Sequence, residues 1–344
     1  MLSLVDILVL TKISDIKKNT LKVVMQDMSL CPQNVEELHN IIHNLLNKPW
    51  FLQDTKMLYA KATEEVKQAN AKDIKIITII DAQFPDRLRY ISNPPIILFV
   101  KGEVSILNAP LSVAVVGTRE ISEYGTRIAK TFSYDLAKED VVIVSGLALG
   151  CDTQAHLGCL SANGKTIAVL AHGLDTIYPF TNIALAEDII KKGGCLVSEY
   201  PLGVKPQKFH FIHRNRIQSG LSQATIVIES KKQGGTLTTA KYCKEQGRLL
   251  YCFQPTSGVN KLIFEGNSLL IKSGAIPIKD DAVKDVLIGI KKTIAMDLTS
   301  DNTLFSTYSI FKMEPKKRTR ELVLTQNDTQ KVNKKNISNP GIIL

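Results

Sequence analysis

The chain has 344 residues and a formal net charge of +10, with 44% of its residues hydrophobic. This length suits two or three domains of about 150 residues and supports a substantial hydrophobic core, which argues against a disordered chain or a small disulfide-stapled domain. No stretch approaches the roughly 18 uninterrupted apolar residues of a transmembrane helix, and residues 1–10 lack a basic start and a cleavage site. We therefore expect a soluble, cytoplasmic protein with no membrane association, and the excess positive charge favours an anionic partner.

The six cysteines are scattered along the chain without any CxxC pair. This spacing predicts neither a zinc ribbon nor a disulfide framework. Most of the cysteines are expected to be small buried side chains, and we expect no bound metal and no cofactor.

Residues 1–82 predict a small helical domain. Apolar residues recur at helical spacing, as at Leu38, Ile42 and Leu45, and prolines at 32 and 49 separate short helices. Further prolines at 85, 94 and 95 precede an extended apolar run over 96–100 and mark a change of structure near residue 83.

Residues 83–280 predict an α/β domain with a doubly wound, mostly parallel sheet. Short β-branched runs alternate with helical stretches, as in parallel sheets covered by helices on both faces. The pattern weakens after residue 280, so residues 281–344 are expected to form a basic, partly disordered tail. The strands are expected near residues 112–116, 140–144, 166–170, 195–198, 225–229 and 249–253.

Small and polar residues follow the predicted strands, and ligands of open parallel sheets bind at the carboxyl ends of the strands. The first strand leads into Gly117, Thr118 and Arg119, and the second ends at Ser145 and Gly146. Glycine lets a ligand approach the backbone, and arginine can hold a phosphate through two hydrogen bonds. Ordinary turn chemistry explains each glycine equally well, but it does not call for Arg119.

A second anion-binding candidate lies at the start of the helix after the fifth strand. Gly235 and Thr236 offer free backbone N–H groups and a hydroxyl to a phosphate, and Lys241 follows in the same helix, where a solvated lysine is the simpler explanation. The glycine runs match neither the dinucleotide fingerprint GxGxxG nor the ATP-binding pattern GxxxxGK[ST]. ATP hydrolysis at a P-loop therefore has no support.

Asp152 and His156 lie four residues apart, on one face of a predicted helix. Such a pair suggests acid–base catalysis, yet the sequence places no nucleophile beside it. A helix-capping aspartate and a packed histidine are the alternative, so we assign no catalytic residue.

The segment 209–216 combines aromatic and basic residues immediately before an apolar helix. Bases stack on aromatic rings and arginine planes, so Phe209, Arg214, Asn215 and Arg216 suit single-stranded nucleic acid. Phe180 is a further stacking candidate. In the alternative, the phenylalanines belong to the core and the arginines form structural ion pairs.

Taken in order over about residues 84–278, these motifs resemble the DprA/Smf family of bacterial DNA-processing proteins. Agreement of several motifs in order and spacing is far more specific than any one of them. The motifs are VVGTR at 115–119 with YG at 124–125, SGLA at 145–148 with AH at 155–156, YP at 178–179, SEYP at 198–201, RNR at 214–216 and GTLTTA at 235–240.

The resemblance implies a Rossmann-like homodimer, without enzymatic activity, that binds single-stranded DNA in a basic pocket and loads the RecA recombinase onto it during natural transformation. It places Arg119 on a DNA-contacting arginine, and Ser145, Gly146, Arg214, Arg216, Gly235 and Thr236 on other pocket motifs. Two positions depart from the family pattern, since Leu149 replaces an arginine and Phe180-Thr181 stands where a basic residue is frequent.

Two alternatives stay open. The first alternative is a nucleotide-binding or phosphoribohydrolase-like Rossmann enzyme, because Gly234-Gly235-Thr236 resembles the GGxGT turn of those enzymes. Their catalytic glutamate, however, has no counterpart at Ala240 or Lys241. The second alternative keeps DNA binding but assigns it to a mobile element or a defence system, which the sequence does not separate from DNA uptake.

Overall fold

The computed structural model describes residues 1–27, 29–46, 49–254 and 261–299. The chain divides into two units, Met1–Ile290 and Lys291–Leu344, and the second is described only to residue 299. Most of the predicted basic tail therefore lies outside the described residues. No helix within the described ranges has the length and apolar character needed to cross a bilayer.

Four helices form the N-terminal part of the first unit. Ser3 caps the first of them, because its Oγ accepts a hydrogen bond from the Asp6 N–H while Asp6 Oδ2 accepts one from the Ser3 N–H at 2.8 Å. Leu8 and Leu10 of this helix are buried in the same apolar cluster as the adjoining strands. The helices are α1 (Leu4–Thr11), α2 (Lys18–Gln26), α3 (Val35–Leu46) and α4 (Leu52–Ala71).

The described strands form one sheet in the order β1-β2-β6-β5-β4-β3-β7-β8-β9. β2 pairs antiparallel with both β1 and β6, and the other neighbours pair parallel. This confirms the predicted doubly wound, mostly parallel α/β fold. The strands are β1 (Ile74–Thr78), β2 (Ile97–Gly102), β3 (Ser112–Val116), β4 (Val142–Ser145), β5 (Thr166–Leu170), β6 (Cys195–Ser198), β7 (Ala224–Val227), β8 (Leu249–Phe253) and β9 (Ile276–Ile278).

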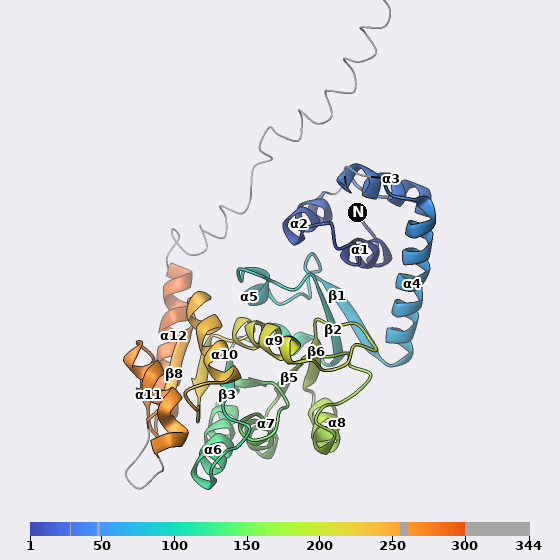
Figure 1. Ribbon diagram of the computed structural model, residues 1–344. Coiled ribbons are helices and arrows are strands. Elements are labelled where there is room, and N and C mark those ends of the chain that lie inside the picture. The colour runs from blue at the N-terminus through green and yellow to red at the C-terminus, as the bar shows by residue number, and fades with distance from the viewer. Residues whose placement is uncertain (28, 47–48, 255–260, 300–344) are drawn as a thin grey trace, which may run out of the picture. The chain divides into compact units, whose positions relative to one another are not determined.

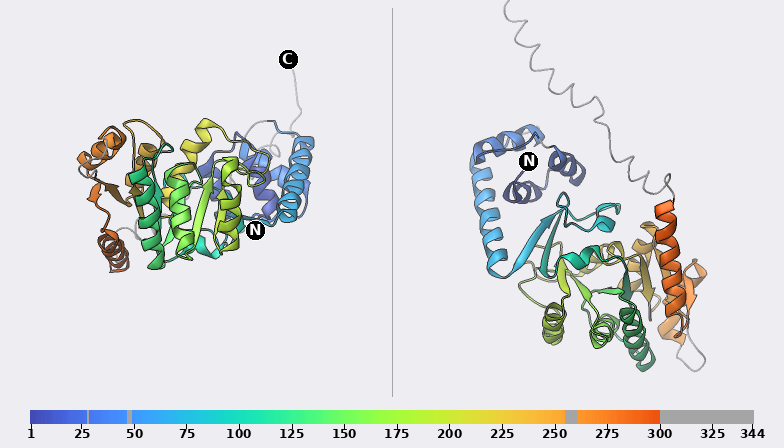
Figure 2. Two further views of the ribbon diagram at one scale, coloured as in Figure 1. Left: turned by 90° about the horizontal axis from the view of Figure 1, so that it is seen from below. Right: turned by 180° about the vertical axis from the view of Figure 1, so that it is seen from behind.

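Helices cover both faces of the parallel part of the sheet. α6, α7 and α8 form one layer, and α9 and α10 lie on the other face (Figures 1 and 2). Every residue of β3, β4, β5, β6 and β7 is buried, as expected for strands covered on both faces. The helices are α5 (Asp86–Arg89), α6 (Glu123–Lys138), α7 (Cys151–Ser161), α8 (Ile183–Lys191), α9 (Lys208–Gly220), α10 (Gly235–Glu245), α11 (Glu265–Lys272) and α12 (Val283–Thr299), with short 3₁₀ turns η1 (Ser105–Asn108), η2 (Phe180–Asn182) and η3 (Lys261–Phe264).

The structure differs from the predicted domain boundaries at two places. β1 already belongs to the sheet, with Ile76 opposite Phe99, so the sheet begins before residue 83. Its five residues follow the long helix α4 directly, and their apolar character reads as a continuation of the helical pattern. At the other end, α12 occupies part of the segment predicted as a tail. Its residues Val286 and Ile290 are buried, so this part of the segment is packed against the fold.

Candidate nucleic-acid-binding pocket

A pocket of about 960 Å³ lies at the carboxyl ends of the central strands. It is bounded by the loop between β3 and α6, the start of α9 and the loop between β7 and α10. The carboxyl ends of parallel strands are where open α/β sheets bind ligands. Of the predicted site residues, it brings together Gly117, Thr118, Arg119, Phe180, Arg214, Asn215, Gly235 and Thr236.

The loop after β3 is held tightly at its base. The Thr118 N–H donates to the Glu229 carbonyl at 2.8 Å, and the Thr118 carbonyl accepts from the Cys151 N–H at 3.1 Å. A Cβ on Gly117 would lie 2.1 Å from Cys151 Sγ, so only glycine fits beside this buried thiol. These contacts fix the backbone from which Arg119 projects.

Arg119 and two aromatic residues form one wall of the pocket. The Arg119 Cζ lies 5.1 Å from the centroid of the Phe211 ring, and the Phe211 ring lies 6.0 Å from that of Tyr178. Phe180, close by in the chain, is 74% exposed. A cation and several aromatic faces are therefore available on the same wall, which is the combination that binds single-stranded nucleic acid.

Arg214 contributes to the pocket from a buried position. It is 4% exposed, and its Nη1 donates to the Val169 carbonyl. Gly146 makes room for it, because a Cβ there would lie 1.9 Å from Arg214 Nη1. Burial lowers the pKa of Arg214 to about 10, the nearby Asp152 carboxyl opposes this shift, and the charge of Arg119 adds to it. Its Nε has no hydrogen-bond partner among the described residues.

The third side of the pocket is the amino end of α10. Asn215 Nδ2 donates to the Gly235 carbonyl at 3.1 Å, which ties α9 to the start of α10. The preceding Gly234 has φ of 149°, a conformation that favours glycine. The first turn of α10 thus presents backbone N–H groups and the Thr236 side chain to the pocket, an arrangement suited to a phosphate.

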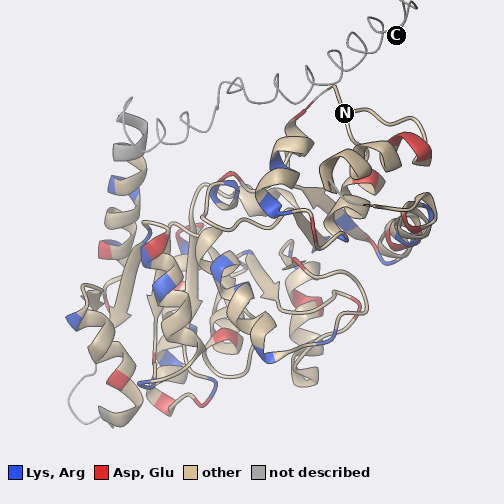
Figure 3. Ribbon diagram, turned by 45° about the horizontal axis from the view of Figure 1, so that its top comes forward, with Lys and Arg blue, Asp and Glu red and all other residues tan. Residues whose placement is uncertain are grey.

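Three lysines complete the pocket, and none was predicted from the sequence. Lys205 lines it from the loop before α9, and Lys208 lines it as the first residue of that helix. Lys231 lines it from the loop after β7, where its Nζ pairs with Glu120 Oε2. Lys205 and Lys208 lie on either side of Pro206, directly before the aromatic segment. This local group of basic residues could have indicated them as phosphate-binding candidates from the sequence. Lysine and arginine positions are spread over helices, strands and loops of the described chain (Figure 3), so charge alone does not locate this pocket.

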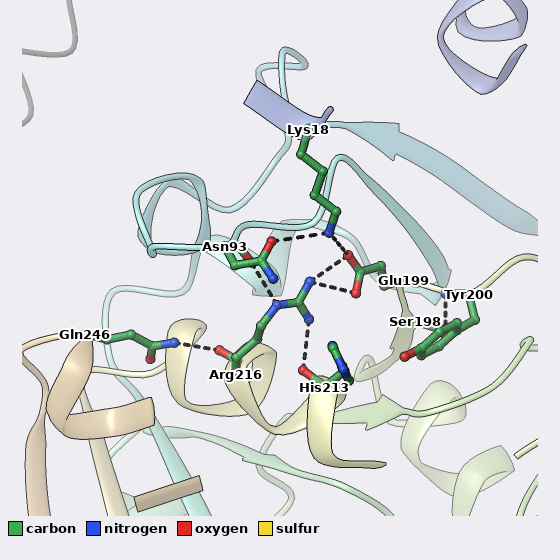
Figure 4. A network of polar contacts seen from close by, with 8 residues as sticks. All are labelled: Lys18, Asn93, Ser198, Glu199, Tyr200, His213, Arg216 and Gln246. Carbon is green, nitrogen blue, oxygen red and sulfur yellow. Dashed lines mark hydrogen bonds and ion pairs between the residues drawn. The ribbon is translucent and has the colours of Figure 1, made fainter. Parts of the chain in front are cut away.

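Arg216 lies outside the pocket, in a separate polar network (Figure 4). It is 3% exposed, and its Nη2 donates to both carboxylate oxygens of Glu199, at 2.6 and 2.7 Å. Its remaining nitrogens donate to the carbonyls of Asn93 and His213, at 2.8 and 2.9 Å. Lys18 Nζ approaches Glu199 Oε1 at 3.5 Å. This is the structural ion pair that the sequence analysis kept as an alternative. All three guanidinium nitrogens are engaged in this network, so Arg216 does not line the pocket.

Four other predicted residues do not line the pocket. Ser145 is buried and donates from Oγ to the Val115 carbonyl at 2.7 Å, and Gly146 lies beneath Arg214. Phe209 is exposed and packs edge-on against His210 rather than into the pocket. Lys241 pairs with a glutamate one turn along α10. Ser145 and Gly146 support the pocket from below, whereas the other two have no contact with it.

The candidate acid–base pair is not arranged for catalysis. His156 is completely buried, and its Nδ1 lies 2.8 Å from Thr166 Oγ1. Burial, and secondarily the charge of Arg214, lowers its pKa to about 3, so this histidine stays neutral. Asp152 instead accepts a hydrogen bond from the Gly146 N–H at 3.1 Å and reaches the pocket only beside Arg214. Among the described residues no three His, Cys, Asp or Glu side chains are grouped so as to hold a metal ion.

Comparison with known proteins agrees with this architecture. The family described as DNA recombination-mediator protein A matches residues 75–289. The DNA processing protein DprA of Bacillus subtilis is 38% identical over 219 residues, which cover 62% of this chain and 73% of that protein. Protein Smf of Escherichia coli is 42% identical over 201 residues, which cover 58% of this chain and 53% of that protein.

The solved structures that are similar to this one include two DprA proteins. The X-ray structure of DprA from Streptococcus pneumoniae has a TM-score of 0.69 and 32% identity, and the match covers 83% of this chain and 98% of that chain. DprA from Helicobacter pylori has a TM-score of 0.56 and 28% identity, over 64% and 96% of the two chains, and that work describes a single-stranded DNA binding mode for the Helicobacter protein. The predicted family resemblance is confirmed.

Proposed function

Because this chain belongs to the DNA recombination-mediator protein A family, we propose that it binds single-stranded DNA in the pocket at the carboxyl ends of its parallel strands. The observation that carries the proposal is the wall on which the Arg119 cation lies 5.1 Å from the Phe211 ring. A polyanion with unpaired bases needs both a cation and an aromatic face, and a duplex hides the faces of its bases.

Two kinds of contact divide the work of binding. Arg119, Lys205 and Lys208 hold phosphates together with the amino end of α10, and phosphate contacts carry no sequence information. Phe211, with the exposed Phe180, offers faces on which any base can stack. Binding is therefore strong for single strands, weakly dependent on sequence and dependent on salt.

A non-enzymatic role fits the groups around the pocket. Of the described residues, two carry carboxyl groups that line it: Glu120, which pairs with Lys231, and Asp152, which lies beside Arg214. A phosphoribohydrolase needs a carboxylate free to act on the sugar. Incubation with nucleoside monophosphates tests that alternative, and release of free base with turnover would replace the present proposal.

The further role, carried over from the family resemblance, is that of a homodimer that protects single-stranded DNA and loads the RecA recombinase onto it. Filament assembly by RecA on DNA coated with single-strand-binding protein, measured with and without this chain, tests it. A rate of assembly unchanged by the protein would restrict the proposal to DNA binding.

The central experiment compares single- and double-stranded DNA of one sequence by fluorescence anisotropy at several salt concentrations. The proposal expects tighter binding to the single strand, with the logarithm of affinity falling linearly with the logarithm of salt concentration. Equal affinity for the duplex would contradict it, because stacking requires unpaired bases.

A further inference from the structure

Two arginines lie close together at the amino ends of the parallel strands, on the opposite side of the sheet's strand direction from the pocket, which lies at their carboxyl ends. Arg87 belongs to α5, and Arg248 directly precedes β8. Arg248 Nη2 donates to the Arg87 carbonyl at 3.2 Å, and Arg87 Nη2 donates to the carbonyls of Ala109 and Pro110, at 2.8 and 3.0 Å. Pro110 comes just before β3. Both guanidinium groups therefore lie at the amino ends of parallel strands.

The positive charge of this pair is only partly offset, by the nearby Asp86 carboxyl. Within the described part of the chain, neither arginine forms an ion pair, and the nearby Asp86 lies 3.5 Å from Arg89 instead. Arg248 Nε is buried and has no hydrogen-bond partner among the residues that the structure describes. Burial lowers the pKa of Arg87 to about 10, and the charge of Arg248 adds to this effect while Asp86 opposes it. Two cations kept partly out of water are costly unless an anion joins them.

The acceptors that hold Arg87 are themselves fixed. Gln223 Oε1 accepts from the Ser112 N–H at 2.7 Å, and Gln223 Nε2 donates to the Pro110 carbonyl. Gln223 and Ser112 are both buried. Arg87 is thus anchored through Nη2 to rigid backbone, and within the described ranges its Nε and Nη1 make no hydrogen bond.

We propose that Arg87 and Arg248 form a second oxyanion site, which takes a phosphate group. A guanidinium fork matches the geometry of phosphate oxygens, and two forks together supply the charge of a tight phosphate contact. The five residues of β3 span roughly 15 Å, so this site is separate from the pocket. A DNA strand that leaves the pocket is one source of the phosphate, and this arm rests on the proposed function; inorganic phosphate is the other source.

The first arm of the test uses a short oligonucleotide that fills only the pocket and one several times longer. The variant Arg87→Gln/Arg248→Gln is compared with Lys61→Gln/Lys67→Gln, which removes two exposed charges from α4. If the strand supplies the phosphate, the arginine variant binds the longer oligonucleotide several-fold more weakly, with its salt slope reduced by about 0.7 for each lost phosphate contact. Its affinity for the short oligonucleotide stays unchanged, as does that of the lysine variant for both.

The second arm uses inorganic phosphate at constant ionic strength in an Arg119→Ala background, which weakens the pocket. Phosphate that binds the folded protein raises its unfolding temperature, and the rise should vanish when Arg87 and Arg248 are replaced. Arg248→Gln alone, which leaves in place the two hydrogen bonds donated by the Arg87 guanidinium, repeats each arm if the double variant is unstable.

The expected result in either arm alone supports the site and identifies the source of its phosphate. Unchanged binding of the long oligonucleotide together with an unchanged phosphate effect would overturn it. Failure of the unmodified protein to bind even the short oligonucleotide would contradict the proposed function instead, and the phosphate arm would still decide this second site.

Discussion

The guanidinium of Arg119 lies over the ring of Phe211, with 5.1 Å between Cζ and the ring centroid. The two residues come from different elements, the loop after β3 and the first turns of α9, and the pocket is where these elements meet. A cation over an aromatic face is favourable in itself, by about 0.5–1 kcal/mol at an exposed site. In this pair, the charge of Arg119 can bind a phosphate and the ring of Phe211 can stack on a base. Each contact is therefore tested by its own substitution.

Replacing Arg119 with alanine should weaken binding of single-stranded DNA about tenfold or more, because a hydrogen bond to a charged group contributes about 1.5–3 kcal/mol. The loss should be similar for all sequences, and the salt slope should fall by about 0.7. Anisotropy titrations at several salt concentrations measure both quantities. Arg127→Ala is the matched control, since Arg127 Cζ lies 5.4 Å from the centroid of Tyr124 outside the pocket. An unchanged affinity and slope for Arg119→Ala would remove it from the site.

Replacing Phe211 with alanine should also weaken binding, but without changing the salt slope. Loss of one stacked base costs about 1–3 kcal/mol, and stacking releases no counterions. Phe209→Ala provides the comparison, because Phe209 lies in the same helix, is exposed and does not line the pocket. Equal losses for the two variants would mean that the strand follows α9 outside the pocket.

Glu120 is a carboxylate at a pocket proposed for a polyanion, and it pairs with Lys231. Glu120→Gln should strengthen binding of single-stranded DNA a few-fold at low salt, since it removes repulsion and frees the Lys231 ammonium group. Lys231→Gln should weaken binding. Glu245→Gln, which breaks the exposed pair with Lys241 on α10, controls for net charge. If Glu245→Gln raised affinity as much as Glu120→Gln, the effect would be one of overall charge and not of the pocket.

The fold was predictable from the sequence because each buried parallel strand is a short apolar run that ends in small or polar residues. The six predicted strands between residues 112 and 253 are present, with bounds that differ by no more than two residues. β1 was missed, since its pairing with β2 depends on a contact between distant parts of the chain. Local periodicity contains no such information.

The site was predictable only in part. Gly117 and Arg119 lie in the loop that begins at the end of β3, and Gly235 begins α10, the helix that follows β7. Sheet topology alone therefore brings them together. Arg214 and Arg216, two positions apart in α9, have different surroundings: Arg214 reaches the pocket, and Arg216 turns toward Glu199. Which face of a helix meets which neighbour is decided by tertiary packing, and the aromatic and basic composition of the segment cannot reveal it.

Removal of Glu199 should unfold the protein more easily rather than reduce DNA binding directly. The Arg216 guanidinium would remain buried without its carboxylate, and breaking one side of a buried ion pair costs about 3 kcal/mol. Glu199→Gln should therefore lower the free energy of unfolding in urea while the folded variant keeps its affinity for single-stranded DNA. Glu36→Gln, at the exposed pair with Lys56, should change stability little. A loss of affinity in fully folded Glu199→Gln would show that this network acts on the pocket.

The buried His156 predicts how stability changes in mild acid. Burial, followed by the charge of Arg214, lowers its pKa in the folded protein to about 3, whereas a histidine in an unfolded chain titrates near 6.5. As the pH falls below about 6.5 the unfolded state takes up a proton that the folded state does not, so stability is lost by up to about 1.4 kcal/mol for each pH unit. His156→Gln keeps a polar group near Thr166 and removes this titration. Between pH 6.5 and 5 the unmodified protein should lose about 2 kcal/mol more free energy of unfolding than the variant, measured by urea denaturation. Parallel curves for the unmodified protein and His156→Gln would contradict the expectation.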